Sequence, residues 1–376
     1  MENILISLIC KKTSMLLFLI IYIFSFSSVS IAKEKINSQK KDKITIALIN
    51  FQAVWGDKDI NLKKMLNDIK EASSRGANLI LFPEMSLTGY SMEQDKGLKR
   101  LDRMQVKLAE KYNGASAQAV AKLAKEKNVY VVYGYPEVIG NDPLNVYNSA
   151  IAVGPKGIIG SYQKIHPFGS EVIWCKTGRK PFIFSTPWGP IGISICYDTY
   201  NYPELGRYYA AKGCRVILNP TATSRSYFAA SELVDGKPVN DGKPLNGNNA
   251  QWVNRFKSRV EAVVIQSDIF VASSNLIGAE TSAAGKFMGK CFPGGSSVAG
   301  PLDDKKGTSS YIGYYGTNPA LATDVGIIYS DLDLSKAKRK SFENYIKTDL
   351  QSKYLYDPTL YAEWYTDLAN GKYTEN

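Results

Sequence analysis

The sequence predicts an α/β fold in which layered sheets are covered by helices. Short apolar, β-branched segments alternate with helical segments in the first part of the chain, and strands then follow strands. The chain has 376 residues, of which 44% are hydrophobic and 22% charged, so it can bury a substantial core within one large domain. No internal repeat interrupts this pattern.

The elements can be predicted in order along the chain. An apolar strand at 44–51 is followed by a helix at 60–75 with apolar residues at helical spacing, and Gly76 to Asn78 separate it from a buried strand at 79–82. The region 231–249 is rich in Gly, Pro and Asn and predicts a long surface loop. The remaining predicted strands are 129–135, 147–153, 157–162, 182–184, 191–195, 216–218 and 269–273, and the remaining helices are 115–127, 202–212 and 254–267.

The N-terminal region has the order of a secretory signal. Lys11 and Lys12 precede an apolar run, and Ser30-Ile31-Ala32 is typical of a cleavage site. We therefore predict a signal peptide at 1–32 with cleavage after Ala32, and a periplasmic or secreted protein; an uncleaved membrane anchor is the alternative. A polar linker at 33–43, one large folded domain at 44–335 and a polar C-terminal tail at 336–376 complete the predicted organisation.

Composition excludes several functional classes. The formal net charge is +11, but lysines are spread along the chain, so we expect a solvated surface and no nucleic-acid partner. His166 is the single histidine and none of the five cysteines forms a CxxC pair, so neither a multi-histidine metal site nor a zinc knuckle is expected. If Cys196 is a nucleophile, export allows at most one disulfide among Cys175, Cys214 and Cys291.

Three residues at the ends of predicted strands carry candidate chemistry. Cys196 lies between a strand and a helix, where the helix N-terminus would favour a thiolate; Asn201 is predicted to cap that helix. Glu84 directly follows an apolar strand, where burial raises a carboxyl pKa toward that of a general base. Lys164 ends another strand and could offer a cation to an oxyanion. Each residue also has an ordinary structural interpretation when it is taken alone.

Together these segments resemble a known family. FPEMSLTGY, YQKIHPFGSE and GISICYDTYNYPE are similar, in the same order, to three blocks of the nitrilase/amidase (carbon–nitrogen hydrolase) superfamily. The resemblance runs from about residue 43 to about residue 333. It implies a four-layer α-β-β-α sandwich, a Glu84–Lys164–Cys196 triad and no cofactor or metal. It also implies a second glutamate at Glu171, a pocket bordered by the residues after Asn219, and a homo-oligomer.

The implied mechanism assigns further roles. Glu84 takes the thiol proton, and Lys164 together with the backbone N–H of Tyr197 stabilises the tetrahedral intermediate. The Cys196-Tyr197-Asp198 sequence is more typical of amidases than of nitrilases, which favours a small amide or N-carbamoyl substrate. Tyr200 stands where many relatives have arginine, and Asn219 and Tyr200 are candidates for binding substrate. Alternatives remain open: a papain-like use of His166, nitrile hydrolysis, acyl transfer, or a scaffold that only binds.

Overall fold

The computed structural model describes residues 41–224, 232–234, 237–240, 243–244, 249–302, 312–339 and 358–370. The predicted signal peptide, its cleavage site after Ala32 and nearly all of the linker lie outside these described ranges. Within them, no helix has both the length and the apolar character that crossing a membrane requires.

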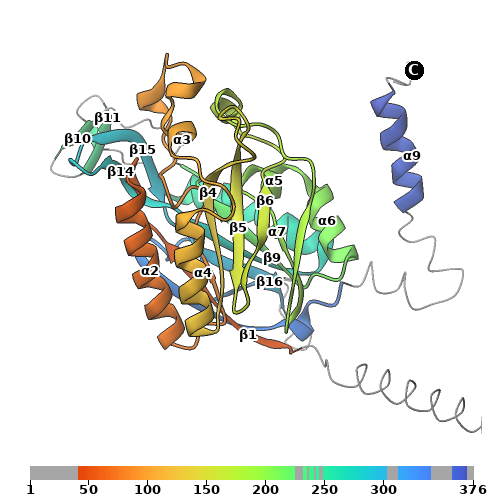
Figure 1. Cartoon of the computed structure of the whole chain (residues 1–376). Helices are drawn as coiled ribbons and strands as arrows, with labels where there is room; N and C mark the ends of the chain where they lie inside the picture. Colours follow the sequence, from red (N-terminus) through yellow and green to blue (C-terminus); the bar gives the residue numbers. More distant parts are fainter. Residues whose placement is uncertain are drawn as a thin grey trace, which may run out of the picture. The chain divides into compact units, whose positions relative to one another are not determined.

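Two six-stranded mixed sheets form the centre of the domain (Figure 1). In the first, β1, β3 and β4 run parallel, and the other neighbours pair antiparallel. Its strands, in spatial order, are β18 (Gly326–Asp333), β1 (Lys43–Asn50), β3 (Leu79–Leu81), β4 (Tyr130–Val138), β5 (Val146–Gly154) and β6 (Gly157–Gln163).

The second sheet has the same mixed character. Strands β8, β9 and β13 run parallel, and β7, β16 and β17 pair antiparallel at its two edges. Its strands, in spatial order, are β17 (Ile312–Tyr315), β16 (Ser297–Pro301), β13 (Phe270–Asn275), β9 (Val216–Thr221), β8 (Gly189–Ile193) and β7 (Phe182–Thr186).

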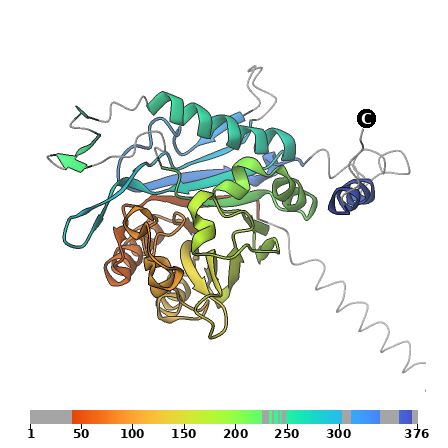
Figure 2. The same ribbon diagram turned by 90° about the horizontal axis from the view of Figure 1, so that it is seen from above.

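Alternation along the strands sorts the core into three apolar clusters. In β1, Ile46 and Leu48 belong to the cluster between the two sheets, whereas Ala47 and Ile49 belong to the cluster under the helices. Neighbouring residues point to opposite faces of a strand, so a strand buried on both faces is apolar throughout. Three clusters separate four layers, which confirms the predicted α-β-β-α sandwich (Figure 2).

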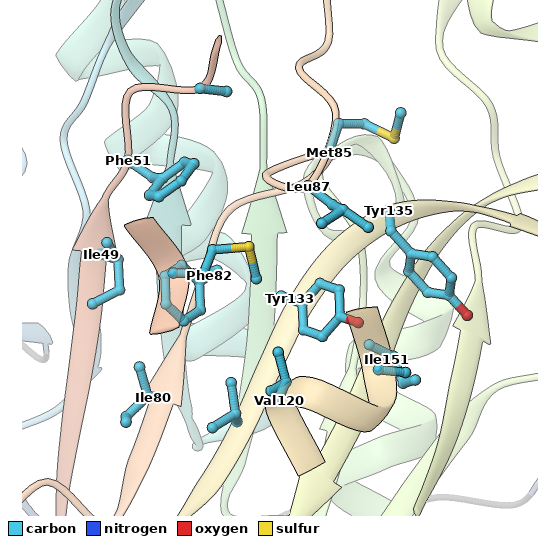
Figure 3. Packing of buried hydrophobic residues seen from close by; sticks show 14 of the residues in the cluster. Ile49, Phe51, Ile80, Phe82, Met85, Leu87, Val120, Tyr133, Tyr135 and Ile151 are labelled. Carbon is cyan, nitrogen blue, oxygen red and sulfur yellow. The ribbon is translucent and has the colours of Figure 1, made fainter. Parts of the chain in front are cut away.

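Helices cover the outer face of each sheet. Helices α2 (Lys58–Ser74) and α4 (Ala115–Lys127) pack on the first sheet, where Val120 joins Ile80 and Tyr133 in one buried cluster (Figure 3). Helices α6 (Pro203–Ala211) and α7 (Asn249–Ser267) cover the second sheet.

Two small three-stranded sheets lie outside the two central sheets. A small sheet combines β2 (Val54–Trp55), β14 (Ile277–Ser282) and β15 (Phe287–Pro293). The predicted loop at 231–249 contains the strands β10 (Glu232–Val234), β11 (Lys237–Asn240) and β12 (Lys243–Pro244), because polar residues can pair through their backbones without apolar alternation.

The predicted helix at 202–212 is present as α6 (Pro203–Ala211), but the prediction that Asn201 caps it is wrong. A short helix, α5 (Tyr197–Asn201), precedes α6, and the N-cap of α6 is Tyr202 without a side-chain cap. Asn201 therefore ends a helix instead of capping one. Pro203 explains the break, since a proline ring disfavours helical geometry in the residue before it.

In the polar tail, α9 (Pro358–Ala369) is a helix that the sequence analysis did not predict.

The two sheets bring several strand ends to one edge. Strands β3, β4 and β6 point in the same direction, because β5 pairs antiparallel with both β4 and β6. Glu84 follows β3 and Lys164 follows β6, whereas Cys196 follows β8 in the second sheet. Strand ends in α/β sheets are where ligand sites commonly form.

Candidate active site

Two glutamates and one lysine form a fully buried ionic cluster. The Lys164 ammonium donates to Glu84 Oε1 at 2.7 Å and to Glu171 Oε1 at 2.9 Å. All three side chains are 0% exposed. A buried pair of carboxylates is tolerable here because the shared cation and additional donors satisfy their oxygens.

Further donors fix the orientation of the Glu84 carboxylate. Asn148 Nδ2 also donates to Oε1 at 2.8 Å, and the backbone N–H of Ala222 donates to Oε2 at 2.8 Å. A carboxylate offers about four lone-pair positions, so Oε2 keeps one for a proton. Burial raises the pKa of Glu84 above its ordinary value and the charge of Glu171 adds to this, while Lys164 and Asn148 oppose the shift.

Lys164 remains the cation of the cluster. Burial acts to lower the pKa of its ammonium, but the negative charges of Glu171 and Glu84 outweigh burial and raise the pKa well above the usual value. Its backbone is anchored as well, since the Lys164 N–H donates to the Asn148 carbonyl at 2.8 Å. A fixed ammonium beside a basic carboxylate is an arrangement suited to stabilising a developing oxyanion.

Tyr90 is a member of this cluster that the sequence analysis missed. Its hydroxyl donates to Glu171 Oε1 at 2.7 Å, and the backbone N–H of Phe168 donates to Glu171 Oε2 at 3.0 Å. Tyr90 is itself held by Glu280, which accepts from the backbone N–H groups of Tyr90 at 2.7 Å and Ser91 at 2.6 Å. Tyr90 lies within the FPEMSLTGY block, so its position in that motif was the available signal.

Cys196 adopts a backbone conformation that few non-glycine residues accept. Its φ of 47° and ψ of −104° place it outside the common regions, a form of strain that concentrates at functional sites. Its N–H is held by two acceptors, Asn219 Oδ1 at 2.9 Å and the Pro220 carbonyl at 3.0 Å. The turn presents the thiol directly before α5.

The thiol is protonated in this environment. Burial and the charge of Glu84 raise the pKa of Cys196 to about 12, while Lys164 and a hydrogen bond from Thr221 oppose the shift. Burial and the Glu84 charge therefore oppose a thiolate in the resting site, and the expectation that the helix N-terminus favours the thiolate stays a prediction.

The segment after β9 joins the base to the nucleophile. Ala222 N–H contacts Glu84, and the hydroxyl of the next residue, Thr223, lies 3.7 Å from Cys196 Sγ. Adjacent residues of one segment thus contact both groups. The sequence analysis placed the residues after Asn219 at the pocket border without assigning either contact.

The three predicted substrate-contacting residues occupy different positions. Asn219 is fully buried behind Cys196, and Tyr200 donates its hydroxyl proton to Thr221 Oγ1 at 3.0 Å. Within the described ranges the Tyr197 N–H, the first of α5, makes no hydrogen bond, as is usual for the first turn of a helix. Contact of these residues with substrate stays a prediction.

His166 is engaged away from the thiol. Its Nδ1 lies 2.7 Å from Asp198 Oδ1, and its ring stacks on Tyr202 with centroids 3.4 Å apart. Asp198 also accepts from the backbone N–H of His166 at 2.8 Å, so the pair ties the segment after Lys164 to α5. This geometry disfavours a papain-like use of His166. Among the described residues, no cluster of three or more potential ligands could hold a metal ion.

Comparison with known proteins identifies similar chains. A family model described as carbon-nitrogen hydrolase matches residues 45–309. The chain is 35% identical to a nitrilase of Pyrococcus abyssi over 179 residues, which cover 47% of this chain and 64% of that relative. It is 27% identical to an omega-amidase of Homo sapiens over 309 residues, which cover 77% of this chain and 89% of that protein. The match thus spans less than two thirds of the Pyrococcus abyssi nitrilase.

Solved structures share the fold. A mutant of the amidase from Nesterenkonia sp. AN1, with the acetamide moiety of fluoroacetamide added at its active-site cysteine, superposes with a TM-score of 0.54 and 21% identity. The superposition covers 82% of this chain and 98% of that one.

Proposed function

This chain belongs to the carbon-nitrogen hydrolase family, and from that premise we propose that it is an exported thiol hydrolase that cleaves a small amide or N-carbamoyl compound. The observation that carries the proposal is the buried Glu84–Lys164–Glu171 contact set, linked to Cys196 through adjacent residues. A scaffold that only bound ligands would gain nothing from three charges buried beside a strained cysteine.

Acylation begins with the protonated thiol. Glu84 takes the proton through the free position on Oε2 as Sγ attacks the carbonyl carbon, and the Lys164 ammonium with the Tyr197 N–H stabilises the oxyanion. Glu84 then gives that proton to the nitrogen of the leaving group. The C–N bond breaks, ammonia or an amine departs, and a thioester remains on Cys196.

Deacylation uses water. A water molecule attacks the thioester carbon and transfers a proton to Glu84 or Glu171, and the carboxylic acid leaves as the thiol is restored. Both carboxylates are anchored by neighbouring donors, so neither must reorganise during the step. The sequence that follows the nucleophile, Tyr197-Asp198, favours an amide over a nitrile as substrate, and the omega-amidase relative supports the same choice.

The test is release of ammonia by the purified chain from Lys33 onward across small amides, N-carbamoyl compounds and nitriles. Cys196→Ala should abolish release, whereas Cys214→Ala, which replaces a cysteine buried between the second sheet and its helices, should retain it. Release that survives in Cys196→Ala, or no release from any compound, would contradict the proposal. Product analysis with added amine or hydroxylamine separates hydrolysis from acyl transfer.

Export and assembly belong to the same proposal. The n-, h- and c-region order before Lys33 supports cleavage after Ala32. Mass spectrometry of the protein from its native host should find Lys33 at the N-terminus, and an upstream start would contradict export by cleavage.

Light scattering of the purified protein should find a homo-oligomer; a monomer alone would exclude the oligomer.

A further inference from the structure

A continuous chain of side-chain hydrogen bonds leads from Asn219 to the nucleophilic sulfur. Asn219 Nδ2 donates to the Tyr200 hydroxyl at 3.0 Å, and this hydroxyl donates to Thr221 Oγ1 at 3.0 Å. Thr221 Oγ1 lies 2.8 Å from Thr223 Oγ1, which lies 3.7 Å from Cys196 Sγ. The carboxylates and the lysine have no part in this chain.

The direction of the protons follows from counting donors. The Asn219 amide nitrogen can only donate, so the Tyr200 oxygen accepts there and its single proton goes to Thr221. Thr221 thereby accepts, and its proton is left for Thr223 or for the sulfur itself. When Thr221 donates to Thr223, the proton of the Thr223 hydroxyl is left for Cys196 Sγ.

The two ends of the chain are held in place. Asn219 Oδ1 accepts from the Cys196 N–H at 2.9 Å, so the amide cannot flip without losing that contact. At the other end, Asn275 Oδ1 accepts from the Thr223 N–H at 3.0 Å and Asn275 Nδ2 donates to the Thr223 carbonyl at 3.2 Å. Thr223 is thus fixed by two backbone contacts, and its hydroxyl meets the sulfur in a set position.

The surroundings of the sulfur make such a donor useful. Burial and the Glu84 carboxylate both oppose a negative charge on Cys196, and Lys164 shares its ammonium between two carboxylates. A neutral hydroxyl supplies a hydrogen bond without a further charge. Tyr200 passes this orientation from the Asn219 amide to Thr221 through its phenol hydroxyl.

We propose that Thr223, oriented by Asn219, Tyr200 and Thr221, donates a hydrogen bond to Cys196 Sγ and stabilises the thiolate formed during attack. Thr223 is the catalytic contact and Tyr200 is a positioning residue, while Thr221 orients Thr223 and also lies within hydrogen-bonding reach of the sulfur. The inference rests on the proposed thiol chemistry, and it applies to both the attack on substrate and the return of the thiolate when the thioester breaks down.

The experiment follows alkylation of Cys196 by iodoacetamide across pH in the full mature chain, with peptide-level mass spectrometry to separate Cys196 from the other cysteines. Thr223→Val should move the alkylation profile of Cys196 to higher pH and lower kcat about tenfold with KM nearly unchanged, because a bond to a charged group is lost. Thr223→Ser keeps the hydroxyl and should restore both readouts. Thr281→Val, a half-buried threonine on β14, is the matched control.

Tyr200→Phe sharpens the test. It removes the donor to Thr221, so the chain loses its fixed direction and the alkylation profile should shift in the same sense, by less than in Thr223→Val. An unshifted Cys196 profile in Thr223→Val would overturn the proposal, as would a Thr223→Ser variant as impaired as Thr223→Val. Alkylation needs no substrate, so the outcome is distinguishable from failure of every amide in the turnover assay.

Discussion

The two sheets contribute chemically different halves of the site. The first sheet and its loops supply a charged half, comprising Glu84, Lys164, Glu171 and Tyr90. The second sheet supplies a neutral half, comprising Cys196, Asn219, Tyr200, Thr221 and Thr223. The two halves differ in role: the carboxylates that accept protons are buried with a compensating cation, whereas the nucleophile is surrounded by hydroxyls and an amide that form hydrogen bonds without ionising.

The largest expected effect comes from removing the base of the charged half. Glu84→Gln keeps the shape of the side chain but cannot take the thiol proton, so kcat should fall by about 10²- to 10⁴-fold. Steady-state ammonia release measures this, with Glu71→Gln, an exposed residue of α2, as control. A Glu84→Gln variant with near-normal kcat would assign the base elsewhere.

Removing the cation tests why the charged half is stable. In Lys164→Met, Glu84 loses its cation, and breaking a buried ion pair in this way costs about 3–5 kcal/mol of unfolding free energy. The folded pKa of Glu84 would then lie further above its unfolded value, so the stability it contributes is present at low pH and is lost as pH rises through the folded pKa. The destabilisation should be smaller at pH 5 than at pH 8.

Thermal unfolding at the two pH values measures that difference. Lys122→Met, on the exposed face of α4, should change little at either pH. A pH-independent loss of stability in Lys164→Met would argue that packing, not charge, explains the effect.

Glu280, which holds the backbone of Tyr90 in the charged half, should make the stability of the fold depend on pH. Burial raises the pKa of Glu280 to about 7, against the backbone donors of Tyr90 and Ser91 and the charge of Lys290. The pKa of Glu280 in the unfolded chain is near 4.5. Its contribution to the free energy of unfolding is fully present below that pH and is lost as pH rises through about 7. Glutamine does not ionise, so the free energy of unfolding of Glu280→Gln should rise relative to that of wild type by ~3 kcal/mol between pH 4.5 and pH 8.

Chemical unfolding across that pH range checks the prediction, and the same comparison with Glu71→Gln should show no such trend. A constant difference between Glu280→Gln and wild type would mean that Glu280 ionises normally in the folded protein.

A pair of tyrosines separates the two halves directly. Tyr90→Phe removes a donor to the Glu171 carboxylate, so kcat should fall about tenfold. Because Tyr90 bonds a carboxylate and not the hydroxyl chain, the pH profile of Cys196 alkylation should shift less than in Tyr200→Phe. Equal alkylation shifts in Tyr90→Phe and Tyr200→Phe would contradict the claim that only the neutral half affects the ionisation of Cys196.

The smallest effect is expected at the single histidine. Glutamine in place of His166 can still donate to Asp198, and His166 lies outside both halves, so kcat should change less than about threefold. Amide turnover by His166→Gln measures this. Loss of activity comparable to that of Glu84→Gln would restore the papain-like alternative.

Much of the fold followed from local patterns. The mainly apolar, β-branched character of 44–51 predicted a strand, the wholly apolar 79–82 predicted a buried strand, and α4 begins and ends at the predicted residues. The start of α5 escaped prediction, because five residues carry too little periodicity and Pro203 suggested a single helix start. The small strands within 231–249 were missed for a similar reason, since their polar sequence shows no alternation.

The sequence by itself determined which residue types stand at the strand ends: Glu84, Lys164 and Cys196 are each recognisable from their motifs. Only the tertiary structure decided that the thiol is protonated at rest, because burial and the Glu84 charge act across two sheets. It also decided the direction of the hydroxyl chain, since proton orientation depends on which neighbours can donate and which can accept. Such couplings join residues far apart in the chain, and only the packing of β3, β6, β8 and β9 brings them within hydrogen-bonding distance.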